Sequence, residues 1–474
     1  MTGVRGRSGD PKPAGEGVGV SGRRSSNPGD GGQVVVIGGG LAGIAAALDC
    51  AQAGARVTLV EVRRRLGGAA YSFEREGLQV DNGQHVFLRC CVAYRGLLER
   101  LGSSSAVRVQ ERLEIPVLSP GSEPVMLRRG RLPAPLHLAG TLLRYRNLPL
   151  RQRLSAARAV AALARLDPRE QAFDERGQTF GGWLSEHGQD EEAVALLWDL
   201  IVLATLNLPA AQASLGLGVF VFREGLLSKS SAGDIGFHER PLTETLGEPA
   251  ASALAGAGVE LRFGWRARRI EGDGAGLIVW GTGELEEEPL RADAVIVAVP
   301  HARAAGLLDG LQPELAGRLR RLENSPIVNL HVVYDRIVCE HRFAAGVRSP
   351  VQYLFDRTAA GGVPPGCQYL AVSLSGADRE MEMSADELKE RYLPALSALL
   401  PRARGARVEA FFATREHAAT FRAVPGVARL RPGTRTSTPG LLLAGAWTDT
   451  GWPATLEGAV LSGHAAARAA LGSA

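Results

Sequence analysis

The sequence predicts an α/β fold in which a parallel sheet, built from three separated segments, carries an inserted α+β domain. Three observations predict it. Residues 33–61 read as strand, glycine turn, helix and strand, residues 248–300 alternate helix and strand again, and residues 440–471 add a buried strand and a helix. Residues 111–235 between them are rich in helical patterns. Two independent domains in sequence are the alternative, but they leave the strand at Leu441–Ala444 without a sheet to join.

The expected domain boundaries follow from these segments. The sheet domain takes residues 33–110, 240–300 and 436–474, and the inserted domain takes residues 111–239 and 301–435.

Composition excludes several classes of protein. Residues 1–32 contain ten glycines and few large apolar side chains, so we expect a disordered tail. The net charge of +4 over 474 residues gives no reason to expect that the protein binds nucleic acid. The five cysteines show no C-x-x-C spacing, and the neighbours Cys90 and Cys91 rarely pair, which indicates a reduced, cytosolic setting without a metal site. Neither a transmembrane helix nor a cleaved secretory signal is expected.

The first strand–turn–helix unit carries the most specific motif. Gly38, Gly40 and Gly43 form G-x-G-x-x-G, and Glu61 ends the second strand. The first glycine permits a tight turn, the second lets the backbone approach a pyrophosphate, and the third lets the helix pack close to the strand. Phosphates would lie at the helix N-terminus, and Glu61 is placed to accept hydrogen bonds from a ribose diol. The unit therefore predicts a Rossmann-like site for FAD or NAD.

Two further turns follow this unit. Gly67 and Gly68 would turn backbone N–H groups toward the pyrophosphate from the other side, and Arg65 is placed to reach a phosphate. An ordinary glycine loop is the alternative. The run Asp81–His85 separates two apolar stretches. Its Asn-Gly pair is a common hairpin signal, but the glutamine and histidine after it are unusual where a strand should resume.

The C-terminal run joins a strand, a loop and a helix. The strand ends at Gly445, and a loop of small residues leads into a helix that starts near Leu456. The first amides of that helix would stabilise negative charge on a ring system. Trp447 and Trp452 in the loop suggest the wall of a cofactor or substrate site, although tryptophan also anchors ordinary cores.

Together these segments resemble the superfamily of FAD-containing amine oxidases and phytoene desaturases over residues 33–470. The runs DNGQHVFLRCC (Asp81–Cys91) and WTDTGWPATLEGAVLSG (Trp447–Gly463) are most similar to the hydroxysqualene dehydroxylase family. The resemblance implies FAD, with its adenosine near Glu61 and its diphosphate over Gly38–Gly43. It also implies an isoalloxazine ring between the Gly83–His85 turn and the Pro453–Glu457 loop. The cofactor contacts that it implies in these two turns and at the end of the last strand are Gly83, Gln84, Gly445, Thr455, Leu456 and Glu457.

The resemblance further implies a reaction and partners. The family reduces hydroxysqualene, a C30 isoprenoid, to squalene with loss of the hydroxyl as water, in bacterial hopanoid synthesis and beside two squalene-pathway synthases. Two departures stand out. Ala446 replaces an aspartate that normally contacts the ribityl or phosphate region, with Asp449 as a candidate substitute, and Ala69 replaces an arginine common in amine oxidases.

The implied reaction requires an acid. Replacing an allylic C–OH by C–H needs a hydride at carbon and a proton on the leaving oxygen, since water leaves more readily than hydroxide. His85 is the first candidate for the general acid, with Asp81 to orient it. A histidine that satisfies a backbone carbonyl is the alternative. Arg89 would pair with a phosphate or with Asp81, and Asp199 is either a tunnel group or part of a solvated helix face.

A basic stretch suggests where such an enzyme works. Residues 124–166 contain nine arginines and no acidic residue, with leucines interleaved. Such a segment suits an anionic membrane surface, so we expect a cytoplasmic protein that is peripheral on the inner face of the cell membrane. A solvated charged face or an acidic partner protein are the alternatives.

Two other functions stay open. A carotenoid or phytoene-type FAD-dependent desaturase would share the fold, because the sequence does not fix the direction of electron flow. A non-catalytic flavin-binding scaffold at the membrane would account for Ala446.

Overall fold

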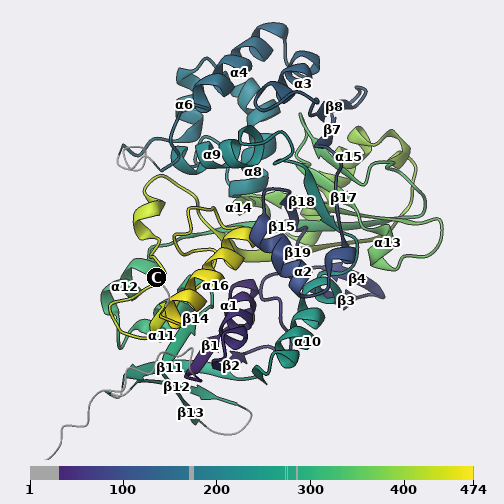
Figure 1. The fold of residues 1–474 in the computed structure, drawn as a ribbon. Coiled ribbons are helices and arrows are strands. Elements are labelled where there is room, and N and C mark those ends of the chain that lie inside the picture. Colours follow the sequence, from purple (N-terminus) through teal and green to yellow (C-terminus); the bar gives the residue numbers. More distant parts are fainter. Residues whose placement is uncertain (1–30, 170–175, 273, 275, 284–286, 473–474) are drawn as a thin grey trace, which may run out of the picture.

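The predicted parallel sheet is present. The computed structural model describes residues 31–169, 176–272, 274, 276–283 and 287–472, so the expected tail lies outside the described residues except for 31–32 (Figure 1). Five strands from three separated segments pair in parallel in the order β10-β2-β1-β14-β20. They are β1 (Gln33–Ile37), β2 (Arg56–Glu61), β10 (Glu260–Phe263), β14 (Ala294–Val297) and β20 (Leu441–Leu443).

Both faces of this sheet are covered, which explains its uninterrupted apolar strands. Val34 and Val36 pack into one apolar cluster with helices α1 and α16, whereas Val35 and Ile37 join another with Trp265. Helices α1 and α16 lie against each other (Figure 1). The surrounding elements are α1 (Leu41–Gln52), α2 (Val92–Arg100), α10 (Glu248–Gly256), β11 (Arg266–Gly272), β12 (Leu277–Thr282), β13 (Glu287–Ala292), α11 (His301–Leu308), α12 (Pro313–Arg320) and α16 (Leu456–Ala470).

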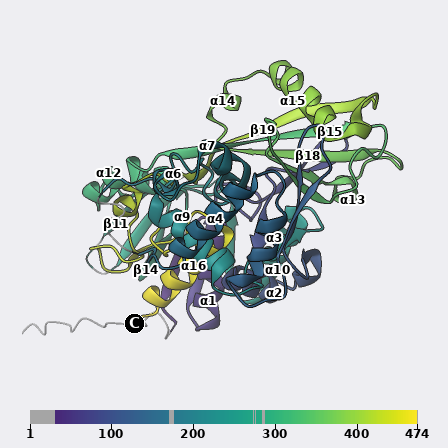
Figure 2. The same ribbon diagram turned by 90° about the horizontal axis from the view of Figure 1, so that it is seen from above.

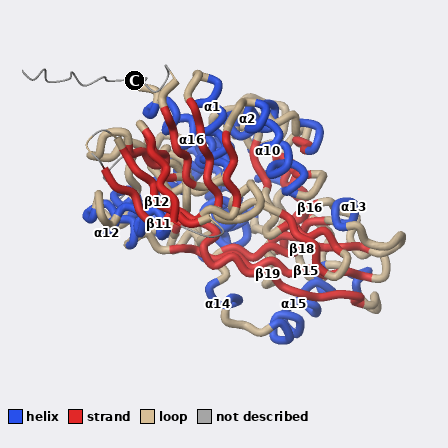
Figure 3. Tube along the Cα trace, turned by 90° about the horizontal axis from the view of Figure 1, so that it is seen from below, coloured by secondary structure: helices blue, strands red, loops and turns tan. Residues whose placement is uncertain are grey.

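A second, mixed sheet forms a separate group of strands (Figure 3). Its order is β19-β15-β18-β17-β16-β7-β8. Its strands β15 and β18 pair antiparallel, and helix α15 begins at a capping box formed by Ser384 and Glu387. The elements are β7 (Glu114–Leu118), β8 (Val125–Arg128), β15 (Asn324–Tyr334), β16 (Phe343–Gly346), β17 (Tyr353–Asp356), α13 (Thr358–Gly361), β18 (Gln368–Ser375), α14 (Asp378–Met381), α15 (Ala385–Leu399) and β19 (Val408–Phe421).

A helical region lies at the top of Figure 1, and Figure 2 shows it from above. It contains α3 (Ala139–Arg144), α4 (Leu150–Leu163), α6 (Phe180–Glu186), α7 (Glu191–Ala193), α8 (Asp199–Leu206) and α9 (Leu215–Phe222). Small sheets connect the parts: β3 (Ser72–Arg75) with β4 (Leu78–Asp81), and β9 (Ile235–His238) between β5 (Val86–Leu88) and β6 (Val107–Val109). Because β9 pairs with strands from 33–110, the chain does not separate cleanly at residue 239, and the domain boundaries stay a prediction.

Candidate functional site

A cavity of about 1250 Å³ runs from the glycine turn into the helical region. Its volume exceeds the usual range for one small-molecule site, roughly 300–1000 Å³, so it has room for a cofactor and a second ligand. One end is formed by glycine turns and polar side chains. The other end is walled by apolar side chains, among them Leu113, Leu142, Ile201, Phe220, Val221 and Tyr353.

The glycines build a cradle in which most positions leave no room for a side chain. Gly38 has φ +110°, and a Cβ there would lie 2.6 Å from the Ala298 carbonyl oxygen. A Cβ on Gly43 would lie 1.9 Å from the Gly38 carbonyl oxygen, so Gly43 serves close packing of α1 and lies outside the cavity lining. Gly67 and Gly68 have φ +99° and +59°. A Cβ on Gly68 would lie 2.8 Å from the Gly40 Cα, so the two glycine turns face each other across the cavity wall.

Gly40 offers a clean test of this cradle. Its φ of −78° suits any residue, and a Cβ there meets nothing closer than the Gly68 Cα at 3.8 Å. We expect Gly40→Ala to fold normally yet weaken FAD binding by about 10- to 100-fold, because an added methyl in a filled site typically costs about 1–3 kcal/mol. Flavin release measured by fluorescence would check this. Gly96→Ala in α2, which has open space around it, is the matched control; equal loss in both variants would contradict the cradle.

Glu61 and Arg65 flank the cradle. Glu61 accepts hydrogen bonds from Gly39 N at 2.7 Å and Arg63 N at 2.8 Å. A carboxylate has further lone pairs, so a ribose diol remains compatible with these contacts. Arg65, predicted to reach a phosphate, places its guanidinium 3.4 Å from the Tyr71 ring centroid and donates to the Gly68 carbonyl at 3.1 Å. Its charge stays at the cavity wall, held by the ring and the carbonyl.

The Asn82–His85 turn meets the second sheet at the cavity. Asn82 Nδ2 donates to the Ala69 carbonyl at 2.9 Å and to Glu416 Oε1 at 3.0 Å, and Asn329 Nδ2 donates to the Asn82 carbonyl at 3.2 Å. In the described part of the chain, Gln84 Nε2 and Asn329 Oδ1 are buried without a hydrogen-bond partner. A flavin edge presents both acceptors and an N–H donor, so these residues fit that ring.

His85 lines the cavity, but Asp81 does not orient it as predicted. The Asp81 carboxylate accepts hydrogen bonds from Arg357 at 2.6 Å, Ser72 Oγ at 2.6 Å and Leu242 N at 3.1 Å. Burial lowers the pKa of His85, whereas the charge of Asp81 and a hydrogen bond to the Ala69 carbonyl raise it. Asp81 therefore acts on His85 through its charge.

A buried histidine holds the backbone of this turn. His238 Nδ1 lies 2.8 Å from the His85 carbonyl oxygen, and its Nε2 lies 2.7 Å from the Tyr94 hydroxyl. A carbonyl only accepts, so Nδ1 carries the proton and Tyr94 donates to Nε2. Burial lowers the pKa of His238 to about 3, which keeps this neutral tautomer.

The C-terminal loop supplies the facing wall. Gly445, Ala446, Trp447, Trp452, Thr455 and Leu456 line the cavity. Thr455 caps α16 by accepting from Gly458 N at 3.1 Å. Glu457, predicted to contact the cofactor, lies outside the lining. It is 3% exposed and accepts from Ala93 N and Tyr94 N at 2.9 and 2.7 Å, so it caps α2 instead.

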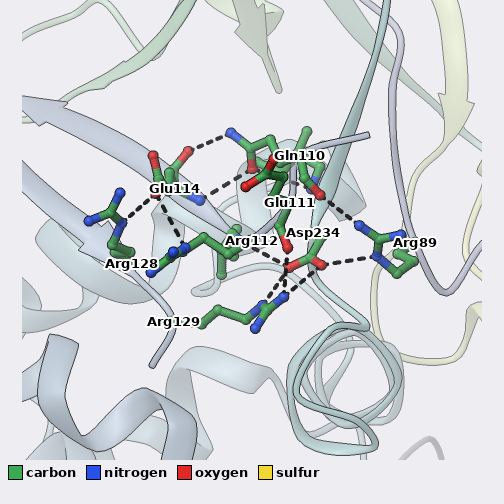
Figure 4. A network of polar contacts seen from close by, with 10 residues as sticks. Arg89, Gln110, Glu111, Arg112, Glu114, Arg128, Arg129 and Asp234 are labelled. Carbon is green, nitrogen blue, oxygen red and sulfur yellow. Dashed lines mark hydrogen bonds and ion pairs between the residues drawn. The ribbon is translucent and has the colours of Figure 1, made fainter. Parts of the chain in front are cut away.

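The other sequence candidates lie outside the cavity lining. Asp449 is exposed and accepts from Gly451 N, so it does not replace the carboxylate missing at Ala446. Asp199 accepts from Ala210 N at 2.8 Å, and burial raises its pKa to about 6. Arg89 pairs with Asp234 and not with Asp81; its Nε lies 2.9 Å from Asp234 Oδ2 (Figure 4).

Two residues that line the cavity were not predicted from the sequence. Asn329 and Glu416 lie on β15 and β19 of the second sheet and reach the Asn82–His85 turn. Neither belongs to a local motif, because the contact depends on how the two sheets meet. For Asn329, the available signal was a polar residue inside a mostly apolar strand.

The sequence is similar to those of known flavoenzymes over most of its length. The model of the family "Flavin containing amine oxidoreductase" matches residues 41–471. The hydroxysqualene dehydroxylase of Rhodopseudomonas palustris is 30% identical over 92% of this chain and 97% of its own length, and that of Sinorhizobium fredii is 29% identical over 92% and 98%. A zeta-carotene desaturase of Zea mays is 23% identical over 91% of this chain and 82% of its own.

Solved structures agree in fold. Cyclohexylamine oxidase from Brevibacterium oxydans superposes with a TM-score of 0.68 at 20% identity, covering 93% of this chain and 99% of that one. The predicted α/β two-domain flavoprotein fold and the FAD cofactor are thereby confirmed. The chain belongs to the flavin containing amine oxidoreductase family and, within it, to the hydroxysqualene dehydroxylases, and it is an FAD-dependent oxidoreductase.

Proposed function

We propose that the protein reduces hydroxysqualene to squalene, with loss of the hydroxyl as water. The observation that carries this proposal is the continuity of one cavity from the glycine cradle to its apolar end in the helical region, here called the apolar arm. A C30 hydrocarbon needs such an arm, because its only polar group is the hydroxyl that must reach the cofactor. The names of the relatives support the same substrate.

The chain's own residues would position the substrate and deliver the proton. FAD, when bound and reduced, supplies the hydride. One nitrogen of the His85 ring is held by the Ala69 carbonyl, which leaves the other to carry a proton to the leaving oxygen. Trp452 packs edge-on against Phe220 with ring centroids 5.1 Å apart, and both line the cavity. These rings would exclude water from the reacting carbon.

Product analysis tests this function against its alternatives. Anaerobically reduced protein with hydroxysqualene should give squalene, and oxidised protein with phytoene should give no desaturated product. The reverse result would favour the carotenoid desaturase. Purified protein that neither holds FAD nor turns over either substrate would favour the scaffold.

We also propose that residues 124–166 contact an anionic membrane surface. Among the described residues, six of the ten exposed large apolar side chains lie between positions 126 and 154. Exposed arginines stand among them, including Arg131, Arg144 and Arg151, and Leu142 of the same region lines the cavity. No helix among the described residues is long and apolar enough to cross a membrane. A peripheral position would let the substrate enter from lipid. Contact with squalene-pathway synthases stays a prediction.

Two leucines on this face provide the test. Leu143 and Leu150 are 55% and 59% exposed. We expect Leu143→Glu with Leu150→Glu to reduce co-flotation with phosphatidylglycerol vesicles by about tenfold or more, because each buried leucine contributes about 1.5–3 kcal/mol. Ile337→Glu, at a 46% exposed position, is the matched control and should float as the parent does. If the parent protein does not bind these vesicles even at low salt, the proposal is contradicted.

A further inference from the structure

Two neighbouring thiols line the cavity and have no part in the proposed reaction. Cys90 and Cys91 connect β5 to α2, and both contribute to the cavity wall. Both are free, Cys90 partly buried and Cys91 6% exposed. The chain turns tightly here, since Val92 N donates to the Cys90 carbonyl at 2.9 Å and Cys91 has φ −75° and ψ 74°. These are the values of an inverse γ-turn centred on Cys91, which fixes the backbone of both cysteines at the cavity wall.

The two thiols differ in exposure and in pKa, since Cys90 is partly buried and Cys91 is buried. The interaction of the Cys91 thiol with Cys90 lowers the pKa of Cys90, and the same interaction, with burial, raises the pKa of Cys91. Cys90 is therefore the nucleophile of the pair and Cys91 its protonated neighbour. Elsewhere, burial raises the pKa of Cys50 to about 12 and that of Cys339 to about 11, which makes both unreactive.

We propose that Cys90 and Cys91 form a redox-active vicinal dithiol that consumes hydrogen peroxide at the flavin cavity. The Cys90 thiolate attacks one peroxide oxygen and breaks the O–O bond, which gives a sulfenic acid and, after protonation, water. The Cys91 sulfur then attacks the Cys90 sulfur, and the sulfenic oxygen leaves as a second water. The two thiols lose two protons and two electrons in all, and peroxide becomes two waters.

The position of the pair suits this chemistry. Reduced flavins react with oxygen, so peroxide is the oxidant to expect in this cavity. A disulfide between neighbouring residues is strained and hence easily reduced, which would make the step reversible by a thiol. The inference depends on the FAD cofactor and not on the identity of the isoprenoid substrate.

Mass spectrometry of the FAD-loaded protein tests the proposal without any substrate. After a stoichiometric dose of hydrogen peroxide, we expect the peptide with Cys90 and Cys91 to lose two hydrogens and resist alkylation until dithiothreitol is added. Cys367, a partly buried lone cysteine, is the internal control and should stay alkylatable. The parent protein alone gives this readout, even if a variant fails to fold.

Two variants separate the roles. Cys91→Ser should accumulate a sulfenic acid on Cys90 that dimedone traps, whereas Cys90→Ser should give neither trap nor disulfide. Cys367→Ser should behave as the parent does. Unchanged alkylation of Cys90 and Cys91 after peroxide, or equal oxidation of Cys367, would overturn the proposal. Either outcome would leave the proposed function untouched, because squalene formation tests that function separately.

Discussion

Replacement of His85 by glutamine is expected to lower the rate of squalene formation by about 10²–10⁴-fold, the usual contribution of a general acid, while FAD stays bound. Glutamine keeps a donor for the Ala69 carbonyl, so the turn should survive. It cannot deliver a proton, and hydroxide would have to leave instead of water. The measurement is a single turnover of the reduced protein with hydroxysqualene, together with the visible spectrum of the bound flavin.

The pH dependence gives the same residue an independent test. Burial lowers the pKa of His85 below its ordinary value. The protonated acid is therefore scarce at neutral pH, and the rate should rise as the pH falls toward that pKa and level off below it. The His85→Gln variant should lose this dependence. If the variant keeps nearly the parent rate and the parent pH profile, another group donates the proton to the leaving oxygen.

Replacement of Asp234 by asparagine is expected to lower the free energy of unfolding by about 1.5–3 kcal/mol, because the buried carboxylate that binds the partly exposed Arg89 and Arg129 is lost. The Asp234 side chain is 1% exposed and binds Arg89 Nε at 2.9 Å and Arg129 Nε at 2.6 Å (Figure 4). It also accepts from Leu113 N at 2.8 Å. The carboxylate thus ties the end of β5 to the segments on either side of the β7–β8 hairpin, where Leu113 and Arg129 line the cavity.

Chemical denaturation of the FAD-loaded protein measures this effect. Asp309→Asn is the control, because Asp309 pairs with Arg320 at the surface, where both side chains are about half exposed. Such a pair contributes about 0–1 kcal/mol. Equal midpoints for Asp234→Asn and the parent would show that the network does not hold the hairpin.

The parts that could be predicted from the sequence are those set by local pattern. The strands of the parallel sheet are apolar on both faces, so β1, β2, β14 and β20 stand out as unbroken runs. The glycine turns are equally local, since a positive φ or a close backbone contact requires glycine at Gly38, Gly67 and Gly68. Strand β19 was not predicted, because its residues are of intermediate burial along most of its length and buried and exposed side chains do not alternate clearly.

The errors concern side chains whose partners are far along the chain. Glu457 follows a motif loop, but its carboxylate caps α2, which begins over 360 residues earlier. Asp81 and Arg89 flank the histidine, yet their partners are Arg357 and Asp234. A motif position identifies the loop that reaches the site, whereas the direction of each side chain depends on tertiary packing.

Reoxidation of the bound flavin tests the central claim most directly. The protein is reduced anaerobically and mixed with hydroxysqualene while flavin absorbance is followed. The cavity that joins the cradle to the apolar arm predicts return of the oxidised flavin spectrum, with one squalene formed per flavin. A flavin that stays reduced in the presence of hydroxysqualene, in protein that binds FAD normally, would contradict the proposed function.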